Sequence, residues 1–208
     1  MLPLDILKII FNYLDLENQI NMISSCNYFR NHLFITDLYN IERKYLDNLT
    51  TEILKYSIFS HVIELDVDNN DKITNVSFMM SLKKLNACGD CGIGQNGIVG
   101  LNLVELDAGN NNKITNVSFM TSLKILNAWS NCGIGQNGII GLNLVQLVAS
   151  NNNKITNVSF MTSLKKLDAW GNCGIGQTGI IGLNLVELDA GGNNKITDVS
   201  FMTSLKNK

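Results

Sequence analysis

The chain has 208 residues, with 16 Lys and Arg against 18 Asp and Glu, for a formal net charge of −2. Nucleic-acid and membrane-surface binders carry a strongly basic face, which this near-neutral balance does not provide. Apolar residues make up 45% of the chain and charged residues 16%, which excludes a disordered protein. No apolar run reaches the roughly 18 residues of a membrane helix. We therefore expect a folded chain with no nucleic acid and no membrane among its partners.

The start of the chain lacks a basic segment and a small-residue cleavage site, so it does not resemble a secretory signal. Five cysteines in a chain without such a signal indicate reduced thiols rather than disulfides. Both observations predict a cytoplasmic protein.

Apolar side chains recur at helical spacing in residues 1–40, and Pro3 stands where a first helical turn accepts proline. Within residues 2–14, Leu-Pro is followed two residues later by an acid, then by an apolar pair, Ile-Phe and Leu. This order resembles the opening of an F-box, and Cys26 and Phe29 fall where that family places a cysteine and an aromatic residue. We therefore expect a small all-α, F-box-like domain over residues 1–40.

The F-box resemblance also implies a partner and a contact surface. F-box helices dock on a Skp-type subunit of a cullin ubiquitin ligase, and the chemistry takes place on other subunits. The resemblance implies that an apolar helical face makes this contact. The residues that it assigns to the contact are Leu2, Pro3, Ile6, Leu7, Ile10 and Leu14.

Residues 41–61 predict one further helix, because Tyr45, Leu46, Leu49 and Ile53 follow helical spacing. We expect this linker to cap the first coil of the repeats that follow, since the end of a repeat stack must be covered. An alternative interpretation is that all the N-terminal helices serve only as such a cap, with no link to ubiquitin.

Residues 62–208 repeat almost unchanged every 41 residues, as the series Leu82, Leu123, Leu164 shows. Each unit holds two half-repeats, of 20 and 21 residues, and seven complete half-repeats precede a truncated eighth. Counted from its first residue, a half-repeat has Leu at position four, Val or Ala at six, Asn or Asp at nine, and Ile at twelve. Alternation over so few residues predicts a short strand with one buried face. An amide at position nine can bond turn backbone and tolerates a left-handed conformation.

This pattern resembles that of the leucine-rich repeat, LxxLxLxxNxL, with Ala in place of one Leu and an extra residue before the Ile. The resemblance implies an α/β solenoid of short parallel strands, in which each coil buries its apolar edge against its neighbours. On the back of the coils we expect Val117 and Phe119 to face inward in the shorter form, and Ile139 and Leu142 in the longer form. Short irregular or 3₁₀ turns are expected there, because Gly and Asn are poor helix formers.

Two motifs within the repeats could indicate other chemistry. Three Gly-x-Gly-x-x-Gly matches, beginning with residues 92–97, lack the long helix and the acid that a dinucleotide site needs, so we interpret them as tight turns. Cys88 and Cys91 form a lone CxxC, whereas a structural zinc needs four ligands. We expect small buried thiols, no metal and no cofactor, with a redox role for these two cysteines as the alternative.

Positions three, five and seven of each half-repeat point away from the core and form the exposed face of the expected sheet. Acid and base alternate in places at position three, which favours lateral ion pairs between strands. Position seven carries Trp129 and Trp170, which would suit a binding surface or would each lie flat over a neighbouring Gly or Ser. The candidate substrate face comprises Glu105, Asp107, Trp129, Lys166, Asp168 and Trp170.

Together these features predict a non-enzymatic adaptor that holds a protein substrate for a cullin ubiquitin ligase. The alternative is a repeat scaffold with no ubiquitin link. No polar helix closes the last coil, so we expect Leu185, Leu188 and Ile196 to be partly exposed and copies to self-associate end to end. Near-identical copies rich in Asn and Ile resemble repeat families expanded in large DNA viruses, which would place the protein in host cytoplasm.

Overall fold

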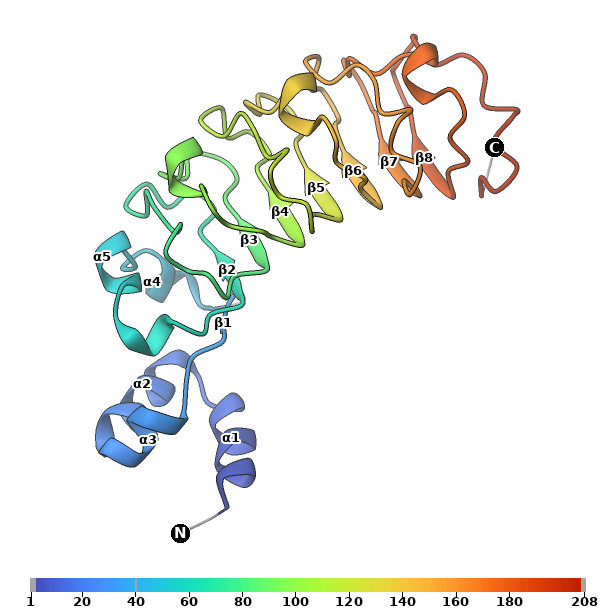
Figure 1. Ribbon diagram of the computed structural model, residues 1–208. Helices are drawn as coiled ribbons and strands as arrows, with labels where there is room; N and C mark the ends of the chain where they lie inside the picture. Colours follow the sequence, from blue (N-terminus) through green and yellow to red (C-terminus); the bar gives the residue numbers. More distant parts are fainter. Residues whose placement is uncertain (1–2, 40, 207–208) are drawn as a thin grey trace.

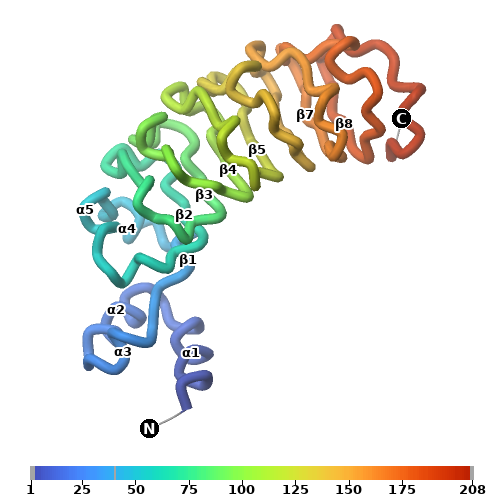
Figure 2. The backbone as a smooth tube through the Cα atoms, in the orientation of Figure 1, coloured from blue at the N-terminus to red at the C-terminus, as the bar shows by residue number. Residues whose placement is uncertain are grey.

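The computed structural model describes residues 3–39 and 41–206, which form a curved solenoid with a small helical segment at one end (Figure 1). One parallel sheet lines the concave side, and turns and short 3₁₀ helices form the convex side (Figures 1 and 2). The N-terminal helices lie beyond the first strand (Figure 1). The expected solenoid of short parallel strands, preceded by helices, is confirmed.

The helical segment begins with three short helices. The carbonyl of Pro3 accepts a hydrogen bond from the Leu7 N–H at 3.1 Å, so the first helix begins directly after the proline. The side chain of Asp15 accepts from the Asn18 N–H at 2.8 Å and caps the second helix. The three helices are α1 (Leu4–Asn12), α2 (Leu16–Ser25) and α3 (Asn27–His32).

The sheet keeps equivalent positions of successive coils side by side. Leu85 pairs with Leu106, and Leu106 pairs with Leu126, so the leucines at position four form one buried column. Because each coil covers the apolar edge of its neighbour, a continuous core runs along the stack. The eight strands are β1 (Asp37–Leu38), β2 (Glu64–Asp66), β3 (Lys84–Asn86), β4 (Glu105–Asp107), β5 (Ile125–Asn127), β6 (Gln146–Val148), β7 (Lys166–Asp168) and β8 (Glu187–Asp189).

The shorter coils bury an asparagine at position nine, as expected. Asn111 is representative: its Nδ2 donates to the carbonyls of Ala87 and Ile93 in the preceding coil, at 2.8 and 3.0 Å. Its Oδ1 accepts from the Lys113 N–H at 2.9 Å. Each such amide therefore ties two coils together and pairs backbone groups that would otherwise be buried without a partner. The other members of this ladder are Asn70, Asn152 and Asn193.

The longer coils use a cysteine instead. Asn131, at position nine, is exposed, while Cys132 is buried and its Sγ accepts from the Ile134 N–H at 3.4 Å. The prediction for position nine is thus wrong for these coils. The reason is space: the turn runs so close to the preceding coil that a Cβ at Gly133 would lie 2.5 Å from the Asn112 carbonyl oxygen.

The left-handed residue of each turn stands at position eight, not at position nine as expected. Left-handed backbone suits glycine and asparagine and is costly for most other residues. Ser130, with φ of 57°, is therefore the unusual member of the set. The complete set is Asn69, Gly89, Asn110, Ser130, Asn151, Gly171 and Gly192.

The convex side follows the expected pattern with one correction. Val117, Ile139 and Leu142 are buried, but Phe119 is 39% exposed, because Met120 takes the inward position beside it. Short 3₁₀ helices close the longer coils, as expected: η2 (Gln95–Gly97), η3 (Gln136–Ile139) and η4 (Gln177–Ile180).

Residues 33–39 and 41–61 form a divergent first coil, which the repeat pattern did not reveal. The single helix expected over 41–61 is wrong, because the segment must follow the path of a coil and supply its hydrogen bonds. β1 lies inside the segment predicted to be F-box-like and pairs with β2, so the sheet begins well before Val62. The helical pieces are α4 (Arg43–Leu46), α5 (Thr51–Leu54) and the 3₁₀ helix η1 (Ser57–Phe59).

At the C-terminal end, the expected partial exposure is confirmed for Leu188 and Ile196 and is wrong for Leu185. Leu185 stands at position one and is fully buried, as is Met202 in the stretch of chain after β8, and both belong to the continuous core.

Candidate functional site

Helix α1 presents an apolar face that the rest of the described chain does not cover. Ile6 and Ile10, both predicted to contact a partner, are 43% and 41% exposed. Ile9 and Tyr13 are exposed as well, at 54% and 89%, and were not among the predicted contacts. Their helical spacing with Ile6 was the available signal, since residues three and four apart share a face. Contiguous exposed apolar side chains of this kind mark an interaction surface.

The other predicted contact residues lie differently. Pro3 is exposed beside the start of α1, and Leu7 is buried. Leu14 is half-buried and lines a cavity of about 230 Å³ between the helical segment and α4. Leu2 lies outside the described residues. Pro3, Ile6 and Ile10 are thus the described members of the predicted set that a partner can reach most directly.

The helical segment is not needed to close the first regular coil. Asn70 donates from Nδ2 to the carbonyls of Leu46 and Leu49, at 2.7 and 3.2 Å, as its counterparts do to a preceding coil. Thr51 accepts from the Thr74 N–H at 2.9 Å, the bond that a glutamine side chain receives in later coils. Residues 41–61 therefore supply the capping contacts, which leaves the outer face of α1 free of that task.

The concave face of the sheet carries the ion pairs expected at position three. Lys84 lies 3.6 Å from Glu105, and Lys166 lies 3.0 Å from Glu187. Lys84 also stacks over the ring of Tyr39, at 3.9 Å from its centroid. The Lys84–Glu105 pair is half-buried and the Lys166–Glu187 pair is exposed. Ion pairs that water reaches contribute about 0–1 kcal/mol each, so the fold does not depend on them.

The two tryptophans of position seven each lie against a glycine. The Trp129 indole occupies the space that a Cβ at Gly109, in the preceding coil, would need. The Trp170 indole packs against Gly191, in the following coil, and is 48% exposed. Each ring covers backbone, as one of the two interpretations held, but Trp170 still offers half of its surface to a partner.

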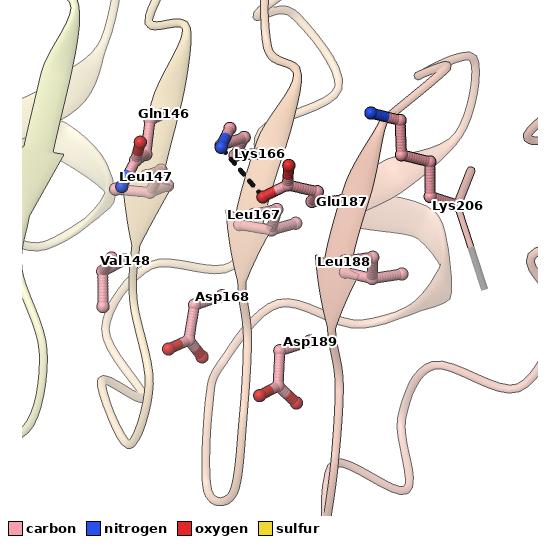
Figure 3. A pocket seen from close by; sticks show the side chains of 10 residues that line it. All are labelled: Gln146, Leu147, Val148, Lys166, Leu167, Asp168, Glu187, Leu188, Asp189 and Lys206. Atoms are coloured by element: carbon pink, nitrogen blue, oxygen red, sulfur yellow. Dashed lines mark ion pairs between the residues drawn. The ribbon is translucent and has the colours of Figure 1, made fainter. Parts of the chain in front are cut away.

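The acids of the predicted face have different surroundings. Asp107 accepts from Asn127 Nδ2 on the neighbouring strand at 2.9 Å, and from the Gly109 N–H at 2.9 Å. Asp168 accepts from the Trp170 N–H at 3.0 Å. A hollow of about 560 Å³ lies over β6, β7 and β8 and includes Lys166 and Asp168 in its lining (Figure 3). The structure thus separates two groups of the predicted residues. Glu105 and Asp107 lie on β4 and Trp129 follows β5, whereas Lys166 and Asp168 lie on β7 and Trp170 follows it.

The cysteines within the repeats are poor candidates for redox chemistry. Burial raises the pKa of the Cys91 thiol and of the Cys132 thiol to about 11. Burial and a hydrogen bond to Asp68, at 3.0 Å, also raise the pKa of Cys88. Thiols with raised pKa values are weak nucleophiles, because the reactive form is the thiolate.

Metal and membrane features can be stated for residues 3–39 and 41–206. Within these residues, no group of three or more His, Cys, Asp or Glu side chains lies close enough to hold a metal ion. None of the helices in the same part of the chain combines the length and the apolar character needed to cross a bilayer.

The architecture defines a repeat solenoid of parallel strands preceded by a short helical N-terminal segment. A family model of the F-box domain matches residues 1–40. No curated protein matches the chain in sequence. F-box domains bind Skp-type subunits of cullin ligases, and F-box proteins are in general non-enzymatic adaptors. The match therefore points to an adaptor of an SCF-type ubiquitin ligase.

Proposed function

We propose that this protein is the substrate-recognition subunit of a cullin ubiquitin ligase. The exposed face of α1 docks on a Skp-type subunit, and the concave face of the solenoid holds the protein to be modified. The observation that carries the proposal is the uncovered row Ile6, Ile9 and Ile10 within the segment that matches an F-box. Tethering a substrate in this way raises its effective concentration near the transfer site, with no bond made or broken by this chain.

The solenoid half of the proposal assigns the coils to the leucine-rich repeats. The leucine column at position four and the asparagine at position nine of the shorter coils support this assignment. In this proposal the protein acts in the cytoplasm, which is the host cytoplasm if the source is a large DNA virus. A repeat scaffold with no ubiquitin link remains the competing function, and it requires no partner for α1.

A binding measurement tests the adaptor proposal. The full chain and the variant Ile6→Ser/Ile10→Ser are titrated with a purified Skp-type subunit by calorimetry. We expect the double change to weaken binding about 30-fold or more, because exposed apolar side chains at such a contact act as hot spots. Ile140→Ser, at a 57% exposed site on the convex side, is the matched control and should bind like the unmodified chain.

The same titration has two outcomes that contradict the proposal. One is equal affinity of the unmodified chain and the Ile6→Ser/Ile10→Ser variant for the Skp-type subunit. The other is no binding by the unmodified chain. Circular dichroism of each variant checks that the helices remain folded, so that a loss of binding reports on the surface.

The proposal also includes contact between copies through the last coil. Within the described residues β8 pairs with β7 alone, and Leu188, Ile196 and Val199 are half-buried beside it. An open sheet edge next to apolar side chains favours pairing with another chain. Sedimentation should show a mass that rises with concentration, and a strict monomer throughout would contradict this part.

A further inference from the structure

The outward column at position five changes character along the concave face. From β2 to β5 it alternates carboxylate and amide: Asp66, Asn86, Asp107 and Asn127 stand next to one another in register. The amide can donate to its acidic neighbour, and Asn127 does so to Asp107 at 2.9 Å. Each acid in this half of the face therefore has a neutral neighbour on the next strand.

The alternation ends at β6. Val148 stands where the next side chain of the series would be and offers no donor, and the following strands place Asp168 directly opposite Asp189. Figure 3 shows the two carboxylates side by side on β7 and β8. Like charges directly opposite on neighbouring strands destabilise a sheet, so this pair costs the fold stability.

Neither acid of the pair has an ion-pair partner among the described residues. Each acid accepts one backbone hydrogen bond, Asp168 from Trp170 at 3.0 Å and Asp189 from Gly191 at 2.9 Å. Lys166 pairs with Glu187 instead, and the Lys206 amine points toward the other end of the strands (Figure 3).

An exposed aromatic ring lies beside the acidic pair. A Cβ at Gly191 would lie 2.8 Å from Trp170 Cδ1 and 3.2 Å from Asp189 Oδ1, so the indole and the carboxylate meet over the same glycine. Trp170 is 48% exposed, and Val148 adds a half-buried aliphatic surface on the other side of Asp168. This sheet face therefore combines apolar contact area with unbalanced negative charge.

We propose that the concave face of β6 to β8 binds an arginine side chain from an extended, partly apolar segment of the protein partner. The inference rests on the proposed function, because it names the chemistry of the segment that the solenoid would hold. The guanidinium lies between Asp168 and Asp189, where its planar set of donors can serve both carboxylates. It also stacks on Trp170, and neighbouring aliphatic side chains of the segment contact Val148.

A peptide titration tests the inference. The probe is an acetylated, amidated peptide of sequence Ala-Val-Arg-Val-Ala, with versions carrying Lys or citrulline in place of Arg. The indole N–H signals of Trp129 and Trp170 are followed by NMR on the full chain, and a Trp170→Phe variant assigns them. We expect the Trp170 signal to shift saturably at a peptide concentration of about 0.1–1 mM. Binding should weaken about tenfold with Lys, and citrulline should abolish it.

Matched variants locate the effect. Asp168→Asn/Asp189→Asn should weaken binding of the Arg peptide about tenfold or more, whereas Asp71→Asn/Asp90→Asn removes the same charge from exposed turns and should change nothing. Equal loss in both double variants, equal binding of the Lys and Arg peptides, or no shift at Trp170 would each overturn the inference. The Skp-type titration tests the proposed function separately, so intact Skp-type binding without peptide binding removes the arginine site alone.

Discussion

The solenoid and the helical segment differ in how far the rest of the chain covers and pairs their side chains. In the solenoid, side-chain hydrogen bonds run from coil to coil. Asn111 alone pairs with the carbonyls of Ala87 and Ile93 and with the Lys113 N–H. In the helical segment α1 packs one side inward, through Leu7 and Phe11, and leaves Ile6 and Ile10 more than 40% exposed. The difference indicates that neighbouring coils cover each other along the stack, whereas the outer face of α1 stays uncovered within the described chain.

The largest expected effect comes from breaking the asparagine ladder. Asn111→Ala leaves the Ala87 and Ile93 carbonyls and the Lys113 N–H without their partner in a buried site. We expect a loss of about 3–5 kcal/mol in the free energy of unfolding, because each unsatisfied buried group costs about 1–3 kcal/mol. Urea denaturation followed by circular dichroism measures it.

The control for that change is the same sequence position in the longer coil. Asn131 is exposed, so Asn131→Ala should alter the free energy of unfolding by less than about 0.5 kcal/mol. Similar losses in the two variants would show that the coil types do not differ in the way described.

A gain of about 1–2 kcal/mol is expected from Ser130→Gly. Ser130 has a left-handed backbone, which costs a residue with a Cβ about 1–2 kcal/mol. Glycine at the equivalent positions 89 and 171 also leaves room for the asparagine side chain at position eight of the preceding coil. Beside Gly89, Asn69 Oδ1 accepts from the Asp90 N–H at 3.0 Å. Among the described residues the Asn131 N–H donates no such bond to Asn110 Oδ1, and the glycine variant should allow it.

Thermal unfolding checks this prediction. Asn151→Gly serves as the comparison, because Asn151 already accommodates the left-handed conformation and accepts from the Asn172 N–H. That variant should gain nothing. A Ser130→Gly variant that unfolds at the same temperature as the unmodified chain would contradict the account of the turn.

The smallest expected effect is the pH dependence at Asp66. Burial raises the pKa of this carboxyl above its ordinary value of 3.8, so the folded state favours the protonated form. Stability due to this group is therefore present at low pH and is lost as the pH rises through the folded pKa. Asp66→Asn should stabilise the protein at pH 7, by no more than about 1 kcal/mol for a half-exposed group, and the gain should vanish below about pH 4. Urea titrations at both pH values measure it, and an equal gain at both would exclude the linkage.

Much of the solenoid could be predicted from the sequence, because the same residue types recur at the same positions of successive repeats. The leucines of position four and the isoleucines of position twelve recur in every coil, so their burial could be predicted. The exchange of Asn111 for Cys132 as the buried polar group could not, since it depends on how closely the turn at Gly133 approaches the preceding coil. That approach is a property of packing between coils rather than of one repeat.

The divergent first coil and the full extent of the candidate surfaces could not be predicted from the sequence. Residues 33–61 have lost the repeat pattern, yet Thr51 and the Leu46 carbonyl still make the hydrogen bonds of a coil. The exposed face of α1 was expected through Ile6 and Ile10, and its extension to Ile9 required the orientation of the helix. The opposition of Asp168 and Asp189 required the strand register.

In the proposed function the helical segment, and not the solenoid, contacts the Skp-type subunit. Amide hydrogen exchange of the full chain, measured with and without a saturating amount of that subunit, tests it most directly. We predict slower exchange in α1 and α2 and unchanged exchange in the strands β2 to β8. Protection spread over the strands, or no protection in α1, would contradict the claim.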